Sequence, residues 1–599
     1  MAWKFGPFEL DEASRVLMLA RQEVQLQPRV FDLLVYLARN SDRVVSKDEL
    51  LEAIWPNVIV TDNSLQRAVS ALRAALRKGG LESAIRNLPG KGYRFSIDRE
   101  PEQKPDVKPQ AGEVSDAPAR ARRAVSMHAW NEASTLFERA DADGLLDGED
   151  LHQWALTLQC LGKPSAAMPI LSRAITARTK EGAIGKAIAD AIMLSDLYFD
   201  AGQIAIGKAW VARAEDWASE IEDSGATAMV LWMKSKVAAF EGEPEQALAL
   251  TEAAYASVRH KDAVAVEALS LAFRGFYRLC LGDTRAGLAD QDQAATLALT
   301  SNGLDPVMGG ILYCNVLWSS RMFGDWARAD QWTRGYQGYC SESGMELTGW
   351  CQLHRSEVLG VRGSLHEALA RIQEALSRLS MESSWAIGDA HRVLGDVHAA
   401  IGDEEAALEA YDKAYSLGWC PEPGRSMLLL ERGEAEAAYA GLERSLIGKA
   451  WWTLQRRGIL LAHLALVAAH TRRRDQAASL ISELSGSPDR WPLPSIRALT
   501  NEAQAVLAFA EQDGDAAIRH LHLARQLWSS VEGKYQAVRL RLKIAKHQLE
   551  SGDVRGALAE VHAAKTVAKE MGALKLQNDC TALERDIRAF NREHSTATR

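Results

Sequence analysis

The sequence predicts a mostly α-helical chain in which a small α+β domain precedes a long array of paired helices. Three observations predict this architecture. Residues 1–98 combine short alternating segments with amphipathic ones, residues 99–122 are rich in proline and charge, and residues 123–590 repeat a helical pattern. At 599 residues the chain is long enough for several domains, although a repeat array can use hundreds of residues on one architecture.

The first 56 residues predict a small sheet followed by two helices. The alternating segments WKFGPFEL, SRVLML and VQLQ are typical of short antiparallel strands. Pro28 is expected to open a helix, because proline fits the first turn, where its missing N–H costs nothing. Ser46 and Glu49 have the spacing of a capping box in front of a second helix, which we expect to stop at Pro56.

A third helix and a hairpin complete the predicted N-terminal domain. The helix should begin near Asp62, a suitable N-cap, and run to about Lys78, where Gly79 and Gly80 end it. The segment AIRNLPGKGYRFSID predicts a β-hairpin with its tip at Pro89–Gly92.

Residues 99–122 predict a linker. They contain four prolines and many charged residues, with no periodic apolar positions. We therefore place the domain boundaries at 98/99 and 122/123, with the helical array ending near residue 590.

The array is recognised by small glycine turns that recur about every 40 residues and are followed by Ala- and Leu-rich segments. In each unit we expect the glycine to adopt the left-handed conformation that ends one helix, and an acidic residue to cap the next. One gap of 81 residues counts as two periods, with a turn expected at Arg473–Arg474. We expect eleven to twelve units, with turns at Gly162, Gly202, Gly242, Gly282, Gly324, Gly363, Gly402, Gly433, Gly514 and Gly552.

The period is irregular at one place. The gap between Gly402 and Gly433 is only 31 residues, and Pro421 and Pro423 interrupt the helical pattern there. A short unit should disturb the stacking of its neighbours, so we expect a break of the array near residues 419–450.

Charge is distributed unevenly between the predicted domains. Residues 1–99 hold 15 Lys and Arg against 12 Asp and Glu, whereas the remaining residues hold 55 against 67. The N-terminal part is therefore at +3 and the rest at −12. A basic segment on an acidic protein suits a nucleic-acid contact surface, although a solvated basic face explains the same counts.

The N-terminal segment resembles the winged-helix DNA-binding domain of OmpR/PhoB-type regulators, in the arrangement of CadC-like proteins. The blocks that carry the resemblance are Arg43–Leu51, Ile54–Pro56, Val60–Leu65, Leu72–Leu76 and Leu88–Phe95. The repeats resemble tetratricopeptide repeats. Residues 130–580 are also similar to the helical region of MalT-type LuxR regulators, on the segments Leu281–Asp283, Tyr313–Cys314, His354–Leu359 and Leu394–His398.

The third predicted helix has the two faces that a DNA-reading helix needs. Leu65, Val69, Leu72 and Leu76 form one apolar stripe, and the other side carries basic and amide side chains. The resemblance implies that this is the recognition helix and that the hairpin is the wing. The candidate DNA-binding residues are Asn63, Gln66, Arg67, Ser70, Arg73, Arg77, Lys91 and Arg94.

The candidates divide by the part of DNA that each suits. Gln66, Arg67 and Ser70 are candidates for base contacts in the major groove, because amide and guanidinium groups pair with base edges. Arg73 and Arg77 are candidates for phosphate contacts. The resemblance places Arg94 at the adjacent minor groove. The alternative for Arg73 and Arg94 is an ion pair with acidic groups of their own domain.

The sequence predicts a one-component transcription regulator and no enzyme. Its partners should be double-stranded DNA and, on the repeats, a protein, peptide or small-molecule effector. RNA polymerase and a second copy of the chain are further candidates. We expect no cofactor, no metal and no membrane contact, and a cytoplasmic location. The family's phosphoacceptor receiver domain is not found in the sequence. The rival hypothesis is an interaction scaffold whose winged helix serves only for docking.

Two further patterns in the sequence are best explained by the repeat array. Gly202–Ala209 has the glycine and lysine spacing of a phosphate-binding loop, but it lacks the Ser or Thr that follows and the preceding strand, so a repeat turn is favoured. Most of the 17 tryptophans are expected in the core, with Trp210, Trp217, Trp326 and Trp332 between helix pairs, and a minority could line a concave binding surface.

Overall fold

The computed structural model divides the chain into two compact units, Met1–Gln110 and Ala111–Arg599. The second unit is described from residue 116 to 597, except residues 260, 262, 301–303, 347, 382–383 and 449. In the first unit the described residues are 2–5, 8–11, 16–19, 22–24, 26, 28–40, 45–46, 49–50, 54, 62–77, 81, 84–88 and 92–95.

The described part of the N-terminal unit has the predicted sheet, the first and third predicted helices and the hairpin, and the first predicted segment, WKFGPFEL, forms two paired strands. An antiparallel sheet runs in chain order, with Leu10 opposite Leu17, and a hairpin follows the last helix. The elements are β1 (Ala2–Phe5), β2 (Phe8–Asp11), β3 (Val16–Leu19), β4 (Gln22–Glu23), α1 (Pro28–Arg39), α3 (Asp62–Arg77), β5 (Ile85–Leu88) and β6 (Gly92–Phe95). The second predicted helix and the hairpin tip lie largely outside the described residues.

The core of this unit joins the sheet to both helices. Phe8, Leu10 and Leu17 of the sheet are buried, as are Leu33, Leu34 and Leu37 of α1. The stripe on α3 is confirmed, since all four of its side chains are at most 1% exposed. One half of the predicted capping box is present, because the Glu49 N–H donates to Ser46 Oγ at 3.2 Å.

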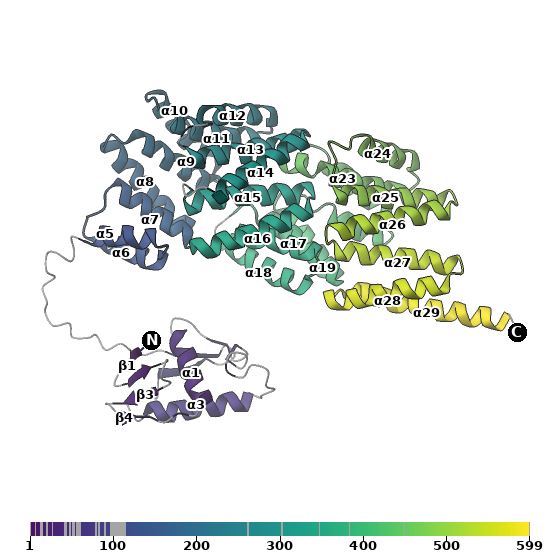
Figure 1. Ribbon diagram of the computed structural model, residues 1–599, viewed down its shortest axis with the longest axis horizontal. Coiled ribbons are helices and arrows are strands. Elements are labelled where there is room, and N and C mark those ends of the chain that lie inside the picture. Colours follow the sequence, from purple (N-terminus) through teal and green to yellow (C-terminus); the bar gives the residue numbers. More distant parts are fainter. Residues whose placement is uncertain are drawn as a thin grey trace. The chain divides into compact units, whose positions relative to one another are not determined.

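The second unit is a solenoid of helix pairs, in which each helix packs mainly on its neighbours in sequence (Figure 1). Twelve successive pairs, α5–α6 through α27–α28, and a final helix α29 are formed by the described residues. This agrees with the upper end of the expected number of units. The helices are α5 (Ala117–Ser126), α6 (Trp130–Ala142), α7 (Gly148–Cys160), α8 (Pro164–Lys180), α9 (Ile184–Asp200), α10 (Ile204–Ser219), α11 (Ser224–Phe240), α12 (Pro244–Val258), α13 (Val264–Leu281), α14 (Thr284–Thr300), α15 (Pro306–Phe323), α16 (Trp326–Ser343), α17 (Gly349–Val361), α18 (Leu365–Met381), α19 (Ile387–Ile401), α20 (Glu404–Ser416), α21 (Gly424–Glu431), α22 (Ala435–Ser445), α23 (Trp451–Ala469), α24 (Arg474–Gly486), α25 (Pro494–Ala510), α26 (Gly514–Ser530), α27 (Lys534–Glu550), α28 (Val554–Met571) and α29 (Leu574–Ala597).

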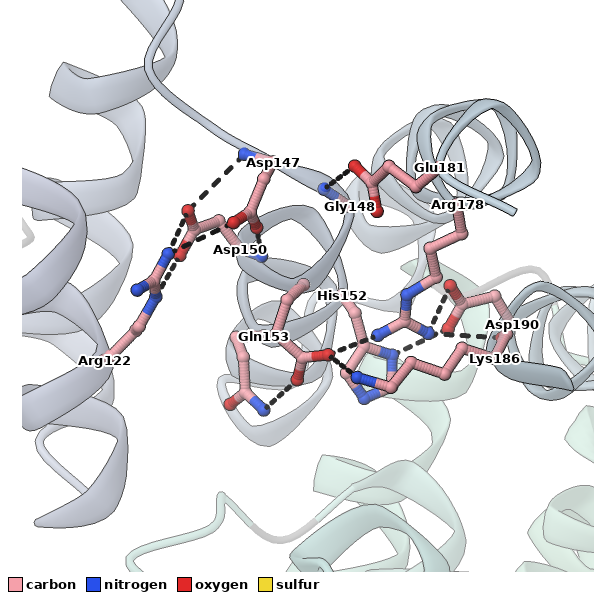
Figure 2. Close-up of polar contacts among 11 residues, drawn as sticks. Arg122, Asp147, Gly148, Asp150, His152, Gln153, Arg178, Glu181, Lys186 and Asp190 are labelled. Atoms are coloured by element: carbon pink, nitrogen blue, oxygen red, sulfur yellow. Dashed lines mark hydrogen bonds and ion pairs between the residues drawn. The ribbon is translucent and has the colours of Figure 1, made fainter. Parts of the chain in front are cut away.

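The solenoid begins earlier than expected, so the predicted end of the linker is wrong. Residues 117–122 belong to α5, where Pro118 stands in the first turn and Ala121 is fully buried. Figure 2 shows how this helix is held: the Arg122 guanidinium donates to both carboxylate oxygens of Asp150, at 2.7 and 2.8 Å. Asp150 in turn closes the capping box at the start of α7. Tertiary packing therefore makes a helix of a segment whose composition is typical of a linker.

The glycine turns are confirmed with one exception. The glycines from Gly162 to Gly433, and Gly552, have positive φ values between 65° and 108°. Gly514 instead begins α26, and Gln512 holds the left-handed position with φ 64°. Asp513 caps this helix by accepting from the Ala516 N–H at 2.8 Å, which shifts the turn toward the N-terminus. The turn expected at Arg473–Arg474 lies slightly earlier, at residues 470–473 between α23 and α24, and Arg474 begins α24.

The solenoid winds back on itself, so that helices far apart in sequence lie against each other. Ser495 Oγ donates to the Gly324 carbonyl at 2.7 Å, and Lys575 Nζ donates to Glu404 Oε1 at 3.2 Å. Both contacts join residues 171 positions apart, about four of the 40-residue periods. Successive turns of the superhelix are therefore in contact.

The expected break near 419–450 is not found. Helices α21 and α22 are short, at 8 and 11 residues, but they continue the order of pairs. Helices α13 and α15, which precede the short unit, both contact α23, which follows it. Contacts between turns thus keep the array in one compact unit across the two prolines.

Contact between successive turns predicts different effects of the same substitution at two glycines with nearly equal φ. Gly402 has φ +108° and faces the next turn, where an added Cβ would lie 2.9 Å from the Lys575 backbone N. Gly448 has φ +109°, and an added Cβ there would meet no described atom within 4 Å. Gly402→Ala should lower the free energy of unfolding by about 1–3 kcal/mol more than Gly448→Ala, because only it pushes two backbones apart. Denaturant unfolding of both variants measures the difference, and equal losses would contradict contact between the turns.

Candidate DNA interface and interior cavities

Arg73 joins helix α3 to the hairpin by hydrogen bonds, in addition to the apolar contacts of the shared core. The Arg73 guanidinium donates to the Ile85 carbonyl from Nε at 3.2 Å and from Nη2 at 2.7 Å. Ile85 begins β5, so these bonds join the helix to the strand that leads into the wing. Its Nη1 takes no part in them. Arg73 therefore has a structural role that its assignment as a phosphate contact did not include.

The hairpin is held on its other edge as well. Val45 and Tyr93 exchange two backbone hydrogen bonds of 2.8 Å each, which tie β6 to the segment before the second helix. Tyr93 and Phe95 are buried and pack in the core of the unit. Helix α3 and the hairpin thus form one rigid arrangement through Arg73, Val45 and Tyr93.

The other candidate residues are placed only by their elements. Asn63, Gln66, Arg67 and Ser70 belong to α3, and Arg94 belongs to β6; their side chains, and Lys91 altogether, lie outside the described residues. Arg77 is exposed in the last turn of α3. Their DNA contacts remain predictions. The position of Arg73 had a signal in the sequence: it lies four residues after Val69 and beside Leu72, at the edge of the apolar stripe.

The interior of the solenoid contains a cavity of about 270 Å³ with aromatic walls. The Trp318 ring lies 5.2 Å from that of Trp451, and the Trp350 ring lies 5.1 Å from that of Trp385. Sequence analysis missed this cluster. Its signal is the regular interval of 32 to 35 residues between five tryptophans, Trp318, Trp350, Trp385, Trp419 and Trp451. The four tryptophans chosen from the sequence are partly buried and pack between helices, as expected.

A network of buried ions lies beside this cavity. Arg321 on α15 is paired with Asp389 on α19 at 3.0 Å and with Glu357 on α17. Arg392 is paired with Asp389 at 2.7 Å, with Glu357 at 2.9 Å and with Asp396 at 2.8 Å. Each guanidinium therefore bridges several carboxylates, as buried charges require.

Burial and charge act in opposite directions on these acids. Burial by itself would raise the pKa of Asp389, but Arg392 and Arg321 bring it to about 2. At Asp396, burial prevails over Arg392 and raises the pKa to about 6. His354 Nδ1 lies 2.6 Å from Arg321 Nη1 and must accept from it, and burial, with Arg321, keeps the pKa of His354 well below its ordinary value.

A second cavity of about 230 Å³ lies on the other side of this network. Arg321, Glu357, Arg392 and Asp396 line part of it. Because His354 lines the first cavity and contacts Arg321, the ion network touches both cavities.

Other site types are not seen in the part of the chain that the structure describes. No three His, Cys, Asp or Glu side chains gather there as they would around a metal ion. No helix among the described residues has the length and apolar character needed to cross a membrane.

Known proteins are similar to the chain in its N-terminal part. Residues 21–95 match the family "Transcriptional regulatory protein, C terminal". The transcriptional activator CadC of Escherichia coli is 35% identical over 78 residues, which is 13% of this chain and 15% of CadC. The phosphate regulon regulatory protein PhoB of Escherichia coli is 34% identical over 88 residues, 14% of this chain and 38% of PhoB. The chain thus spans well under half the length of these relatives.

Solved structures similar to the helical part are more distant. They include the APC/C hetero-tetramer Cut9–Hcn1, with 15% identity, a TM-score of 0.31, and coverage of 78% of this chain and 98% of that chain. The human IFIT1 dimer with PPP-AAAA has 14% identity, a TM-score of 0.26, and coverage of 79% and 95%. Scores this low assign the array to no family, and its resemblance to the MalT-type region stays a prediction.

The family match covers α1, α3 and the hairpin, the elements whose packing is described above. Residues 21–95 therefore carry a transcriptional regulatory domain of the OmpR/PhoB type, and a solenoid of helix pairs follows this unit in the chain.

Proposed function

We propose that the chain is a one-component transcription regulator, in which residues 1–98 bind double-stranded DNA and the solenoid receives the signal. The observation that carries the proposal is the OmpR/PhoB-type domain, whose third helix buries one apolar stripe and is fixed to the hairpin by Arg73. A helix anchored in this way leaves its opposite face for the major groove.

The roles on DNA follow from the chemistry of each side chain. Gln66, Arg67 and Ser70, with Asn63 beside them, contact base edges, where amide and guanidinium groups form paired hydrogen bonds. Arg77 contacts a phosphate, and Arg73 donates to a phosphate through Nη1 while its other nitrogens hold Ile85. Lys91 and Arg94 of the wing contact the adjacent minor groove. These contacts fix register and supply the salt-dependent part of affinity.

The solenoid receives an effector rather than a phosphoryl group. Its two interior cavities and acidic charge suit a small molecule, a peptide or a basic protein surface as the effector. Binding there would change how the DNA-binding domain pairs with a second copy of the chain or contacts RNA polymerase. A scaffold in which the winged helix only docks on another protein is the rival proposal, and salt-dependent, sequence-selective DNA binding decides against it.

The first test concerns base recognition by α3. Gln66→Ala and Arg67→Ala should each lose about 1–3 kcal/mol of discrimination at particular base pairs, because each removes hydrogen bonds to a base edge. The measurement is binding of the full chain to a selected site and to its single-base variants. Arg120→Ala, an exposed change in the solenoid, is the control. Equal weakening on every sequence would show that α3 does not read bases.

A second test separates the two arginines at the end of α3. Arg73→Met should lower the free energy of unfolding of the N-terminal unit by about 1–3 kcal/mol, because the Ile85 carbonyl loses both donors. Arg77→Met should reduce the slope of log affinity against log salt by about 1, because one phosphate contact is lost. Thermal unfolding and DNA titrations at several salt concentrations measure both effects. An unchanged salt slope for Arg77→Met, or unchanged stability for Arg73→Met, would contradict the role given to that arginine.

A third test concerns the solenoid. A chain that ends at residue 110, the limit of the first compact unit, should still bind its site but lose its response to effector in a reporter assay. A chain that ends at residue 126 would carry α5 without the helices on which it packs. It is the matched control for the start of the solenoid at residue 117. Loss of DNA binding in the shorter chain, with folding intact, would show that the solenoid contributes to the interface.

A further inference from the structure

Arg456 on α23 is a buried cation without a carboxylate partner. It is 4% exposed, and no described Asp or Glu forms an ion pair with it. Its only hydrogen bond among the described residues runs from Nη1 to the Cys420 carbonyl and is long, at 3.4 Å. Its Nη2 is buried and has no acceptor within that part of the chain. An ionised group in this condition is costly unless a further acceptor reaches it.

A second unsatisfied nitrogen belongs to the same cavity. Arg392 uses its other nitrogens on Asp389, Glu357 and Asp396, but its Nη2 is also buried and without a described acceptor. Both Arg392 and Arg456 line the cavity of about 230 Å³. Burial, and then the positive charge of Arg392, lowers the pKa of Arg456.

The other charged side chains around the cavity each have a direct partner of opposite charge. Arg321 and Arg392 share Glu357, Asp389 and Asp396, and Arg539 is paired with Glu502 at 2.6 Å. Burial opposes ionisation of Glu502, yet Arg539 and Lys543 lower its pKa to about 2. Arg456 balances the third acid of this group in number, but no described carboxylate pairs with it directly. An oxyanion in the cavity would supply the acceptor that its Nη2 lacks.

The walls of the cavity indicate what accompanies that charge. Trp326, Met427, Trp528 and Tyr535 line it together with the charged side chains. Aromatic and thioether groups favour an apolar body, and the planar fork of a guanidinium matches a carboxylate or phosphate by paired hydrogen bonds.

We propose that this cavity binds a small organic oxyanion, a carboxylate or phosphate group on an apolar body, with Arg456 and Arg392 as its ligating residues. The site deepens the proposed function by naming the class of effector, and only its regulatory consequence rests on that function. Because Arg392 and Arg321 share Asp389 and Glu357, and Arg321 contacts His354, occupancy changes a network that extends to the aromatic cavity.

The test uses the full chain with three probes: benzoate, inorganic phosphate and benzamide, the neutral counterpart of benzoate. Binding is followed by thermal unfolding and by tryptophan fluorescence, since Trp326 and Trp528 line the cavity. At least one of the two anions should bind saturably and raise Tm, whereas benzamide should do neither. Benzoate alone would assign a carboxylate ligand, and phosphate would assign a phosphorylated one.

Two variants on one helix make the test specific. Arg456→Met should weaken anion binding by roughly tenfold to a hundredfold, because a charged hydrogen-bonding partner is lost. Arg457→Met, the same change at the next residue and outside the cavity lining, should bind as the natural chain does. Without ligand, Arg456→Met should be at least as stable as the natural chain, because an apolar side chain replaces an unpaired buried charge.

Four results would overturn the proposal: no binding of either anion, equal binding of benzamide, undiminished binding by Arg456→Met, or an Arg456→Met chain that is less stable or does not fold. The last would mean that the fold itself needs the guanidinium. DNA affinity is measured separately with and without anion. Binding of the anion with unchanged DNA affinity would support the site and count against the signal-receiving role of the solenoid.

Discussion

The contact between successive turns of the solenoid is the constraint on which the rest of the helical domain depends. A helix pair in an open array contacts only its neighbours, and its inner face remains accessible to solvent. Here Ser495 Oγ donates a hydrogen bond to the carbonyl of Gly324, 171 residues earlier in the chain, and α23 packs on α13 and α15. The inner faces are thereby enclosed, which is what makes it possible for Arg321 and Asp389 to be fully buried.

Because the inner faces are enclosed, the ions of the network lose hydration energy and can act on a ligand in the cavity. Arg321, Arg392, Arg456, Glu357 and Asp389 lose most of their hydration, whereas Asp396 keeps part of its own. Replacing buried charged groups by apolar ones is often neutral or stabilising. The network is tolerable because Arg321 and Arg392 each bridge several carboxylates, but Arg456 gains no such compensation. A solenoid needs only apolar and small residues at its inner positions, so charges placed there suit binding better than they suit folding.

Most elements could be predicted from the sequence, because turns, caps and apolar stripes are local signals. The 40-residue period and the stripe on α3 are of this kind. The failures share one cause, which is contact between distant residues. Residues 117–122 have the composition of a linker but are helical, because Arg122 forms an ion pair with Asp150. The prolines near residue 421 interrupt helices but do not divide the array, because α23 packs on the earlier helices α13 and α15. The side chains expected to read DNA lie outside the described residues, so that part of the site remains a prediction.

The uneven charge of the chain limits how a signal can reach DNA. The N-terminal part carries +3 and the remainder −12, so duplex DNA attracts the first and is repelled by the second at distances within the Debye length. The solenoid is therefore poorly suited to strengthen binding by touching phosphates. Under the proposed function, its effect on transcription passes through another route: the segment that joins the two units, pairing between copies of the chain, or a protein partner. An anion at Arg456 would add no attraction for DNA, which again favours a change of conformation or of partner over a change in net charge.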